Sequence, residues 1–267
     1  MRTFLKWAGN KQRMVERITR LLPPGQRLIE PFVGSGALFL NTDYPAYLLA
    51  DSNADLIDLY RRLQTEGGEF IDFCRALFVA ENNTPDAFYG LRESFNQTTD
   101  SRLKSALFLY LNRHGYNGLC RYNASGGFNV PFGRYKKPYF PQKEMEVFWQ
   151  KSGAARFCQA DFATTIQAAQ PGDVVYCDPP YVPLSSTAHF TSYSAGGFGF
   201  AQQLALAAAA REAAARGVPV LISNHATPEI EEAYAGATFE RFQVQRYISA
   251  DGNNRGAVGE LLALFTA

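Results

Sequence analysis

The chain contains few of the residues that bind metals or form disulfides. Its four cysteines form no C-x-x-C pair, and its three histidines show no ligand spacing. These residues are Cys74, Cys120, Cys158 and Cys177, with His114, His189 and His225. We therefore expect no metal site and no disulfide framework, and we interpret the cysteines as buried, reduced thiols.

Long hydrophobic runs are also absent. Apolar runs such as Ala106–Leu111 are far too short to cross a bilayer, and no signal-peptide core follows Met1. We therefore expect a cytoplasmic protein without a membrane partner. The 267 residues are 46% hydrophobic and 19% charged, which indicates a globular chain with one large domain, or one domain carrying an insert.

The formal net charge is only +1, yet the charge is unevenly distributed. No Asp or Glu occurs from Ser101 to Lys143, whereas the rest of the chain has 18 basic and 25 acidic residues. The basic residues of this segment are Arg102, Lys104, Arg113, Arg121, Arg134, Lys136, Lys137 and Lys143. Charge alone fits a solvated basic surface equally well, but the interleaved Tyr and Phe residues favour a nucleic-acid face.

Strands alternate with helices at both ends of the sequence. Strands are expected over residues 27–32, 47–50, 155–159, 173–177, 218–223, 239–248 and 260–265, and helices over 37–41 and 201–216. This alternation predicts an α/β fold with a mainly parallel sheet that helices cover on both faces. The last two strands are expected to pair as a hairpin at the sheet edge.

The middle of the chain departs from this alternation and is predicted to be an inserted domain over residues 54–141. Helical spacing from Leu103 to Leu111 predicts a helix with one buried face. Beyond it, Phe128, Val130 and Phe132 alternate and predict a hairpin with Pro131 on an edge strand. Residues 1–53 and 142–267 would then form the second, catalytic domain.

A glycine-rich segment, Glu30–Gly36, lies between an expected strand and an expected helix. Such a turn allows a ligand to approach the backbone, and Asp51 at the end of the next strand is suited to ribose hydroxyls. A tight structural turn explains the glycines about equally well. Phe39 occupies the third glycine position of G-x-G-x-x-G, which favours a nucleoside without phosphates over a dinucleotide.

The tetrapeptide Asp178–Tyr181 follows a buried run and therefore lies at the carboxyl end of a strand, where open α/β sheets bind ligands. It offers a carboxylate, carbonyl acceptors and an aromatic ring. A planar group with an exocyclic amine fits this set, because the amine donates two hydrogen bonds and the ring stacks. The alternative is a rigid surface turn.

Four motifs in this order resemble the Dam-type DNA adenine-N6 methyltransferases nearly end to end. They are Phe4–Lys11, Pro31–Gly36, Asp178–Tyr181, and a reading segment formed by Leu111–Asn123 with Phe128–Phe140. Asn10 stands where this family commonly has glycine, and we expect a small change of loop geometry, because Asn tolerates left-handed backbone. The segment Ser249–Gly259 is less basic than in that family.

The resemblance implies a Rossmann-like methyltransferase sheet, a helical and hairpin DNA-recognition insert, and S-adenosylmethionine as cofactor. It also implies double-stranded DNA as partner, GATC as target and base flipping. The sequence does not determine the oligomeric state, and we expect a monomer in solution. The implied catalytic residues are Asp178, Pro179, Pro180 and Tyr181. The implied cofactor-binding residues are Trp7, Lys11, Phe32, Gly34, Gly36, Asp51, Asp161, Phe162 and Asp178. The implied DNA-binding residues are Lys6, Tyr116, Asn117, Leu119, Arg121, Asn123, Pro131, Arg134, Tyr135 and Lys136.

Three alternative functions are disfavoured by particular residues. Amino methylation of cytosine more often uses Ser where this chain has Asp178, and methylation of RNA is a further variant of the same chemistry. An inactive DNA-binding protein would not need the intact Asp178–Tyr181 set. A nicotinamide oxidoreductase is disfavoured by Phe39.

Overall fold

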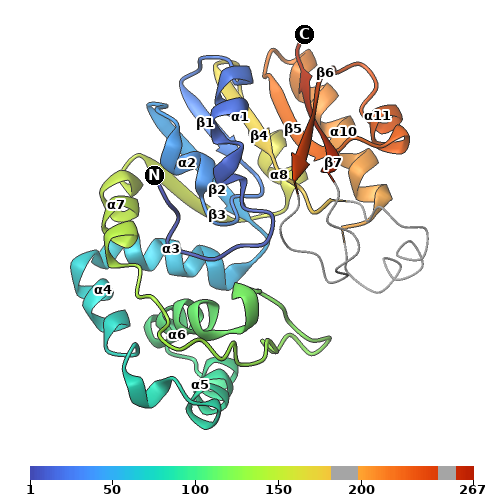
Figure 1. The fold of residues 1–267 in the computed structure, drawn as a ribbon. Helices are drawn as coiled ribbons and strands as arrows, with labels where there is room; N and C mark the ends of the chain where they lie inside the picture. Colours follow the sequence, from blue (N-terminus) through green and yellow to red (C-terminus); the bar gives the residue numbers. More distant parts are fainter. Residues whose placement is uncertain (182–197, 246–256) are drawn as a thin grey trace. The chain divides into compact units, whose positions relative to one another are not determined.

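The computed structural model describes residues 1–181, 198–245 and 257–267, and it contains two compact units (Figure 1). The first unit comprises Met1–Glu16, Val33–Asp43 and Asp51–Gln159. The second comprises Arg17–Phe32, Tyr44–Ala50 and the described part of Ala160–Ala267. Residues 246–248 of an expected strand, and most of the weakly basic segment Ser249–Gly259, lie outside the described residues.

The second unit is built on a sheet with strand order β2-β1-β4-β5-β7-β6, whereas β3 belongs to the first unit. The strands are β1 (Arg27–Glu30), β2 (Ala46–Asp51), β3 (Ala155–Gln159), β4 (Asp173–Cys177), β5 (Val220–His225), β6 (Thr238–Gln245) and β7 (Ala257–Phe265). Strands β2, β1, β4 and β5 are parallel, and β4 and β5 are completely buried. The predicted α/β fold with a mainly parallel sheet is therefore confirmed.

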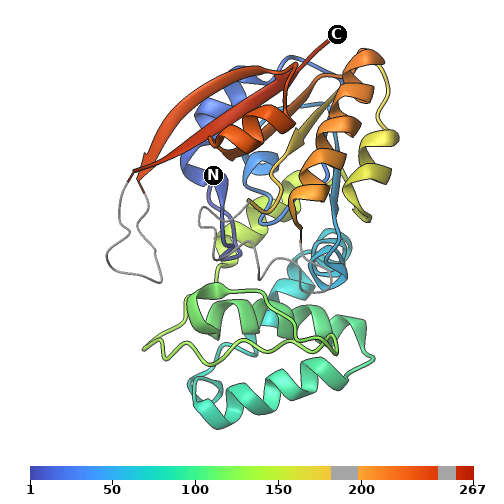
Figure 2. The same cartoon turned by 90° about the vertical axis from the view of Figure 1, so that its right-hand side faces the viewer.

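The last two strands pair with each other as expected. Strand β6 runs antiparallel to β7 from Thr238 opposite Leu264 to Gln245 opposite Ala257. Strand β7 in turn lies antiparallel to β5, so that β6 forms the edge (Figure 2). Strand β1 ends at Glu30, earlier than expected, because Pro31 has no N–H to continue the ladder.

The second unit also contains most of α1 (Val15–Leu21), together with α8 (Phe162–Gln167), α10 (Phe200–Ala215) and α11 (Pro228–Ala233). Helix α10 contains the alanine-rich run and ends just before Gly217, whose φ is 80°. Its described bounds differ by one residue from the expected helix over 201–216. Helices α1, α8 and α11 were not anticipated from the sequence.

The first unit is mainly helical. Its longer helices are α2 (Ala37–Asn41), α3 (Ala54–Glu66), α4 (Gly68–Arg75), α5 (Pro85–Gln97), α6 (Ser101–His114) and α7 (Gln142–Ser152). Short 3₁₀ turns are η1 (Lys11–Arg13), η2 (Ala80–Asn82) and η3 (Tyr116–Gly118). Helices α5 and α6 lie side by side (Figures 1 and 2). Helix α6 is the core of this unit, since every residue from Ser105 to Asn112 is buried and not one face alone.

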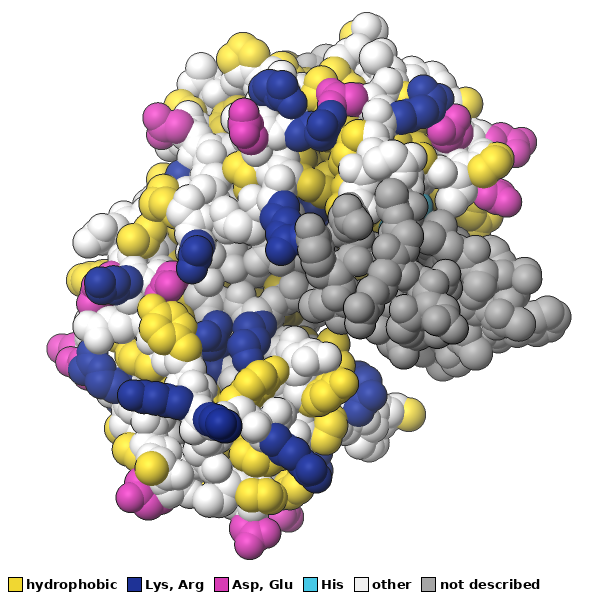
Figure 3. Space-filling model, in the orientation of Figure 1, with side chains coloured by type: hydrophobic (Ala, Val, Ile, Leu, Met, Phe, Trp, Pro, Cys, Tyr) yellow, Lys and Arg dark blue, Asp and Glu magenta, His cyan; other side chains and the backbone are white. Residues whose placement is uncertain are grey.

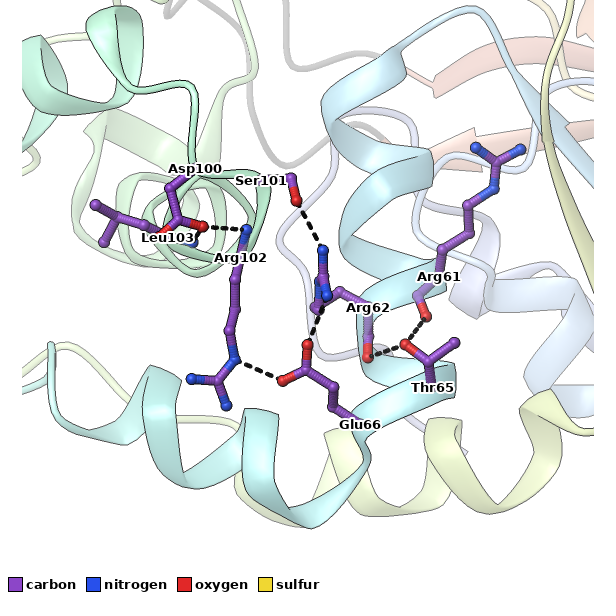
Figure 4. Close-up of polar contacts among 8 residues, drawn as sticks. All are labelled: Arg61, Arg62, Thr65, Glu66, Asp100, Ser101, Arg102 and Leu103. Carbon is purple, nitrogen blue, oxygen red and sulfur yellow. Dashed lines mark hydrogen bonds and ion pairs between the residues drawn. The ribbon is translucent and has the colours of Figure 1, made fainter.

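An ion-pair network joins α3 to α6. The Glu66 carboxylate accepts from Arg62 at 2.7 Å and from Arg102 at 2.6 Å (Figure 4). Lys104 of α6 similarly pairs with Asp55 at the start of α3, at 3.3 Å. The segment without acidic residues is thus partly neutralised by acids from elsewhere in the sequence, so that Arg102 and Lys104 contribute less to a basic face than expected.

The hairpin expected around Phe128, Val130 and Phe132 does not form as two regular strands. Phe128 makes an isolated bridge with Tyr122, and Phe132 makes another with Gly115. The predicted alternation is nevertheless present, because Phe128 and Val130 are buried whereas Pro131 is exposed. The prediction of a hairpin was therefore wrong in its pairing, and of its three alternating side chains Phe128 and Val130 are buried whereas Phe132 is partly exposed.

The cysteines are free. Cys74 and Cys177 are buried as expected, whereas Cys120 and Cys158 are partly exposed. Among the described residues, no group of three or more His, Cys, Asp or Glu side chains is arranged to hold a metal ion. No helix within the described ranges is long and apolar enough to span a membrane.

Candidate functional site

The strand order of the second unit reverses between β1 and β4. The chain proceeds from β1 to β2 on one side and from β4 to β5 on the other, which makes this pair the switch point of the sheet. Open α/β sheets bind ligands outside the carboxyl ends of the strands at such a point. Phe32 follows β1 and Asp178 follows β4 at this edge, because Ile29 pairs with Val175 in parallel register.

Buried side chains hold the turn that follows β4. Ser223 of β5 donates a 2.9 Å hydrogen bond to Oδ1 of Asp178, and its Oγ lies 3.1 Å from the Tyr176 hydroxyl. Gln203 of α10 donates from Nε2 to the carbonyl oxygen of Pro180 at 2.9 Å. Pro179 is buried, whereas Asp178 is partly exposed.

The Tyr181 ring packs edge-on against His225 with ring centroids 4.6 Å apart. Its hydroxyl donates to Oε2 of Glu260 at 3.4 Å. Burial, together with the negative charge of Asp178, raises the pKa of Tyr181 far above its usual value, so the phenol stays neutral. Tyr181 as a residue is partly exposed, as a stacking surface for a base requires.

Three aromatic rings form a cluster beside the β1 turn. Phe32 stacks on Phe162 at 5.7 Å, and both rings meet Phe198 edge-on. Asp161 caps helix α8, with Oδ1 accepting from the Thr164 backbone at 2.9 Å and Oδ2 from the Thr164 hydroxyl at 2.7 Å. The second unit thus brings Phe32 and Phe162 together, while Asp161 has a structural role in this arrangement.

In the first unit, the side chain of Asp51 holds the glycine-rich turn. Its Oδ2 accepts from the Gly34 N–H at 3.1 Å and its Oδ1 accepts from the Asn53 N–H at 3.0 Å. Burial raises the pKa of Asp51, although the backbone N–H groups of Asn53, Gly34 and Ser52 oppose the shift. The structure therefore joins two of the predicted cofactor-binding residues directly.

The glycine turn also contacts two aromatic side chains. A Cβ on Gly34 would lie 2.9 Å from Nε1 of Trp7, so only glycine permits the indole to approach this closely. Tyr60 of α3 donates to the carbonyl of Gly34 at 2.5 Å. Gly36 has a φ of 70° and caps helix α2, which explains the second glycine of the motif.

The N-terminal motif is ordered by local hydrogen bonds. Lys11 is buried and donates from Nζ to the carbonyl of Gly9 at 2.9 Å, and Gly9 has a φ of 74°. Asn10 has a φ of −49°, so our expectation that its tolerance of left-handed backbone matters was wrong. Instead, its Oδ1 accepts from Gln12 at 2.8 Å and caps the turn η1.

Lys6 joins the N-terminal motif to the predicted reading segment. Its backbone exchanges two hydrogen bonds with the Asn112 side chain, at 2.9 and 2.7 Å. Its ammonium group donates to the Arg113 carbonyl at 3.2 Å and lies 3.8 Å from the centroid of the Tyr135 ring. Burial, with a smaller effect of the Arg113 charge, lowers the pKa of Lys6 to about 8.

Most of the predicted DNA-binding residues are exposed on the first unit. The exposed ones are Tyr116, Asn117, Arg121, Asn123, Pro131, Arg134 and Lys136, whereas Lys6, Leu119 and Tyr135 are partly buried. Figure 3 shows Lys and Arg side chains gathered over the part of this unit where Figure 1 draws α4, α6 and the segment after α6. Most of the acidic side chains of that part lie toward its margins.

Several reading residues are held by neighbours that sequence reasoning missed. Asn129 accepts from Nε of Arg121 at 2.7 Å through its side chain and from Nη2 at 3.2 Å through its carbonyl. Oδ1 of Asn123 accepts from the N–H groups of Ser125 and Gly127 and so forms the turn between the two bridged segments. Tyr122 donates to Asp55 of α3 at 2.6 Å, which ties the reading segment to the helix that follows Asp51.

Sequence reasoning also missed Ser223, Gln203 and Tyr60. Each is a polar side chain of a buried strand or helix, and no spacing distinguishes it from other core polar residues. Only Ser223 could have been suspected, because it lies in the strand expected to follow the one that carries the Asp178 turn.

Comparisons with known proteins identify the family of the chain. The chain matches the family described as D12 class N6 adenine-specific DNA methyltransferase over residues 7–248. It is 52% identical over 266 residues to the DNA adenine methylase of Vibrio cholerae serotype O1, covering 99% of this chain and 96% of that protein. The corresponding protein of Escherichia coli K12 is 50% identical over 264 residues, covering 99% and 95%. That of Serratia marcescens is 52% identical over 265 residues, covering 99% and 98%.

A mainly parallel sheet whose strand order reverses between β1 and β4 defines a Rossmann-like α/β protein. The chain belongs to the D12 class N6 adenine-specific DNA methyltransferases, and it is an enzyme that methylates N6 of adenine in DNA. The predicted family and reaction are therefore confirmed. The alternatives of a nicotinamide oxidoreductase, an inactive DNA-binding protein and a cytosine or RNA methyltransferase are set aside.

Proposed function

We propose that this enzyme transfers the methyl group of S-adenosylmethionine to N6 of adenine in GATC sequences of duplex DNA, with the adenine flipped out of the helix. The observation that carries the proposal is the Asp178–Tyr181 turn at the β1/β4 switch point, with Asp178 held by Ser223. An amine inside the base stack is out of reach of such a turn, which is why flipping is required.

The described residues fit S-adenosylmethionine. Asp51 provides a largely buried carboxylate suited to a ribose diol, and it lies beside the Gly34 backbone, which packs closely against Trp7. The stacked Phe32 and Phe162 rings offer an apolar surface for a purine. When bound, the cofactor supplies an electrophilic methyl group on a positively charged sulfur.

We assign further residues to cofactor binding from the resemblance. Trp7 packs against the Gly34 turn, and Lys11 lies in the same motif, with its ammonium group directed at a backbone carbonyl. Asp161 precedes Phe162 and would contribute to binding the adenine of the cofactor. Asp178 would contact both the cofactor and the target amine.

The residues of the turn act by positioning the nucleophile. The N6 amine of adenine is a poor nucleophile, because its lone pair is delocalised into the ring. Hydrogen bonds from the amine to the Asp178 carboxylate and the Pro179 carbonyl would favour tetrahedral geometry and direct the lone pair at the methyl group. Tyr181 would stack on the flipped base, and Pro180 would stiffen the turn. Positioning of this kind supplies roughly 7–11 kcal/mol of rate acceleration in well-oriented systems.

We propose that residues 54–141 form the DNA-recognition domain and that residues 1–53 with 142–267 form the catalytic domain. Two observations support this assignment: Tyr116, Arg121 and Arg134 are exposed, and Lys and Arg side chains gather over this part of the molecule in Figure 3. An Arg side chain can donate two parallel hydrogen bonds to guanine, and exposed Lys side chains such as Lys136 suit phosphates. Because its substrate is DNA, the enzyme would work in the bacterial cytoplasm. It would act as a monomer.

The test is methyl transfer from tritiated S-adenosylmethionine to methylation-free DNA that contains GATC or its single-base variants. We expect labelled N6-methyladenine only in GATC, and a loss of several orders of magnitude in the Asp178→Ala variant. Incorporation into every variant at equal rates would disprove GATC specificity. Retention of more than about a tenth of wild-type turnover by Asp178→Ala would remove this residue from the mechanism.

A further inference from the structure

We propose that two buried side chains, Ser223 of β5 and Gln203 of α10, are positioning residues that aim the acceptors of the Asp178–Pro180 turn at the target amine. The proposal rests on the proposed function, because it assigns these residues to the same reaction. Neither residue belongs to the turn itself, and both are completely buried.

Ser223 is the last member of a hydrogen-bond chain that ends on the carboxylate of Asp178. A hydroxyl has one proton to donate. If Ser223 donates it to Asp178 at 2.9 Å, then the Tyr176 hydroxyl, 3.1 Å away, donates to Ser223 in turn. Burial and the charge of Asp178 raise the pKa of Tyr176, so this phenol keeps its proton. The chain fixes the rotation of the carboxylate plane about its Cβ–Cγ bond.

Gln203 fixes the other end of the turn. Its Nε2 donates to the Pro180 carbonyl at 2.9 Å, which sets the plane of the peptide that follows Pro180. Its Oε1 accepts from Tyr234 at 2.6 Å and from Asn224 at 3.0 Å, so the amide cannot flip without losing these bonds. The two prolines restrict the residues between the anchors, since each has a fixed φ.

The consequence for catalysis is geometric. Reacting atoms must be held within a few tenths of an ångström, and a misplacement of about 1 Å can cost about 100-fold in rate. Removing either anchor should therefore slow the chemical step, while cofactor binding and base flipping remain. A purely structural role would instead lower thermal stability and leave the chemical step of the folded enzyme unchanged.

The first experiment measures three quantities on Ser223→Ala: the single-turnover methylation rate, the affinity for S-adenosylmethionine, and the fluorescence of 2-aminopurine at the target adenine. We expect a 10- to 100-fold slower rate, unchanged affinity and unchanged flipping. Ser223→Thr keeps the hydroxyl and should restore the rate to within about threefold. If Ser223→Ala does not fold, the double variant Tyr176→Phe/Ser223→Ala should be used, because it leaves no buried Tyr176 hydroxyl without a hydrogen-bond partner. It should show the same slow rate. A wild-type rate in the folded alanine variant would overturn the role of Ser223.

The second experiment uses Gln203→Glu, which retains an acceptor for Tyr234 and Asn224 but presents an oxygen to the Pro180 carbonyl. An ionised glutamate cannot donate there, whereas a protonated one can. Burial raises the pKa of such a carboxyl group. The ratio of the methylation rate of this variant to that of the wild type should therefore rise as the pH falls through the raised pKa. If Gln203→Glu does not fold, Gln203→Met serves instead, and a slow rate with unchanged cofactor affinity is expected.

The matched control is Tyr234→Phe, which removes a hydrogen bond from Gln203 without removing one from the turn. It should keep the wild-type rate to within about threefold and lower only the melting temperature. If Tyr234→Phe slows methylation as much as the Gln203 variants, or if the ratio of Gln203→Glu to wild-type rates does not change with pH, the role of Gln203 is wrong. Failure of the wild-type enzyme to methylate adenine, or full activity of Asp178→Ala, would instead overturn the proposed function.

Discussion

The carboxylate of Asp51 provides the sharpest test of the proposed cofactor site. It accepts hydrogen bonds from the Gly34 and Asn53 N–H groups, and we expect it also to accept from the ribose hydroxyls of the cofactor. A hydrogen bond to a charged acceptor contributes about 1.5–3 kcal/mol, equivalent to a factor of about 10–150 in affinity. Asp51→Ala should therefore weaken the binding of S-adenosylmethionine about 10- to 100-fold, as measured by calorimetry.

The alanine variant also removes the support of the glycine turn, so two controls separate the contributions. Tyr60→Phe removes a different hydrogen bond from the same turn, the one donated to the Gly34 carbonyl at 2.5 Å. If turn support alone matters, Tyr60→Phe and Asp51→Ala should weaken binding similarly. The second control is an S-adenosylhomocysteine analogue with a 2′,3′-dideoxyribose, for which Asp51→Asn should lose little affinity compared with its loss for the natural ribose. An equal loss for both sugars would refute contact between Asp51 and the ribose.

The pH dependence provides an independent check. Burial raises the pKa of Asp51 above the usual 3.8, and the ionised carboxylate is the better acceptor for the diol. Cofactor affinity should therefore decrease as the pH falls through this raised value, whereas Asp51→Asn should lack this titration. The effect on folding has the opposite sign. Because the folded state binds this proton more tightly, Asp51 contributes most stability below its unfolded pKa and loses that contribution as the pH rises through its folded pKa.

Three further predictions concern other residues. Arg121→Ala should relax the preference at one guanine of GATC, whereas Lys136→Ala should weaken binding to all DNA sequences and lower the slope of log affinity against log salt concentration by about one. Methylation of single-base variants of GATC at two salt concentrations separates the two effects. An equal loss on every variant would make Arg121 a phosphate contact. Glu66→Gln should lower the free energy of unfolding by about 1 kcal/mol near neutral pH. Burial acts to raise the pKa of Glu66, but Arg102 and Arg62 outweigh it and hold this pKa below its usual value. The loss of stability should therefore vanish in acid, where Glu66 is protonated. A loss independent of pH would argue against the ion pairs. Gly34→Ala should cost about 1–2 kcal/mol of stability and weaken cofactor binding, because φ is +47° and the new Cβ would press on Trp7; unchanged melting and binding would contradict this.

The parts of the fold that depend on local sequence were predictable. Buried runs ending at Cys177 and Asp51 identified strands, and their order along the chain predicted the parallel sheet. Motifs at strand ends could likewise be assigned, because the carboxyl ends of parallel strands are where such a sheet binds ligands. The antiparallel pairing of β6 with β7 was also predicted, since the two strands are neighbours in sequence.

Contacts between distant segments were not predictable. The acids that neutralise Arg102 and Lys104 come from α3, about 40 residues earlier, and no local pattern shows that α3 packs against α6. The expected hairpin failed for the same reason, because its strands pair with Gly115 and Tyr122 through isolated bridges that depend on the surrounding packing. The roles of Ser223 and Gln203 were missed because the role of a buried polar side chain depends on its hydrogen-bond partner, which the sequence does not show.

Backbone strain adds a last argument about the reading segment. Among the residues that the structure describes, the non-glycine residues with positive φ are Asn117 and Arg134, both at 53°. Asn tolerates left-handed backbone better than most residues, whereas for Arg134 it costs about 1–2 kcal/mol that the surrounding contacts must offset. At Asn117 one contact is visible, since the Tyr135 hydroxyl accepts from its N–H at 3.0 Å while the Tyr135 ring faces the Lys6 ammonium group. Tyr135 thereby ties the exposed Asn117 to the N-terminal motif, and positive φ at a non-glycine residue such as Arg134 is most often found at functional sites.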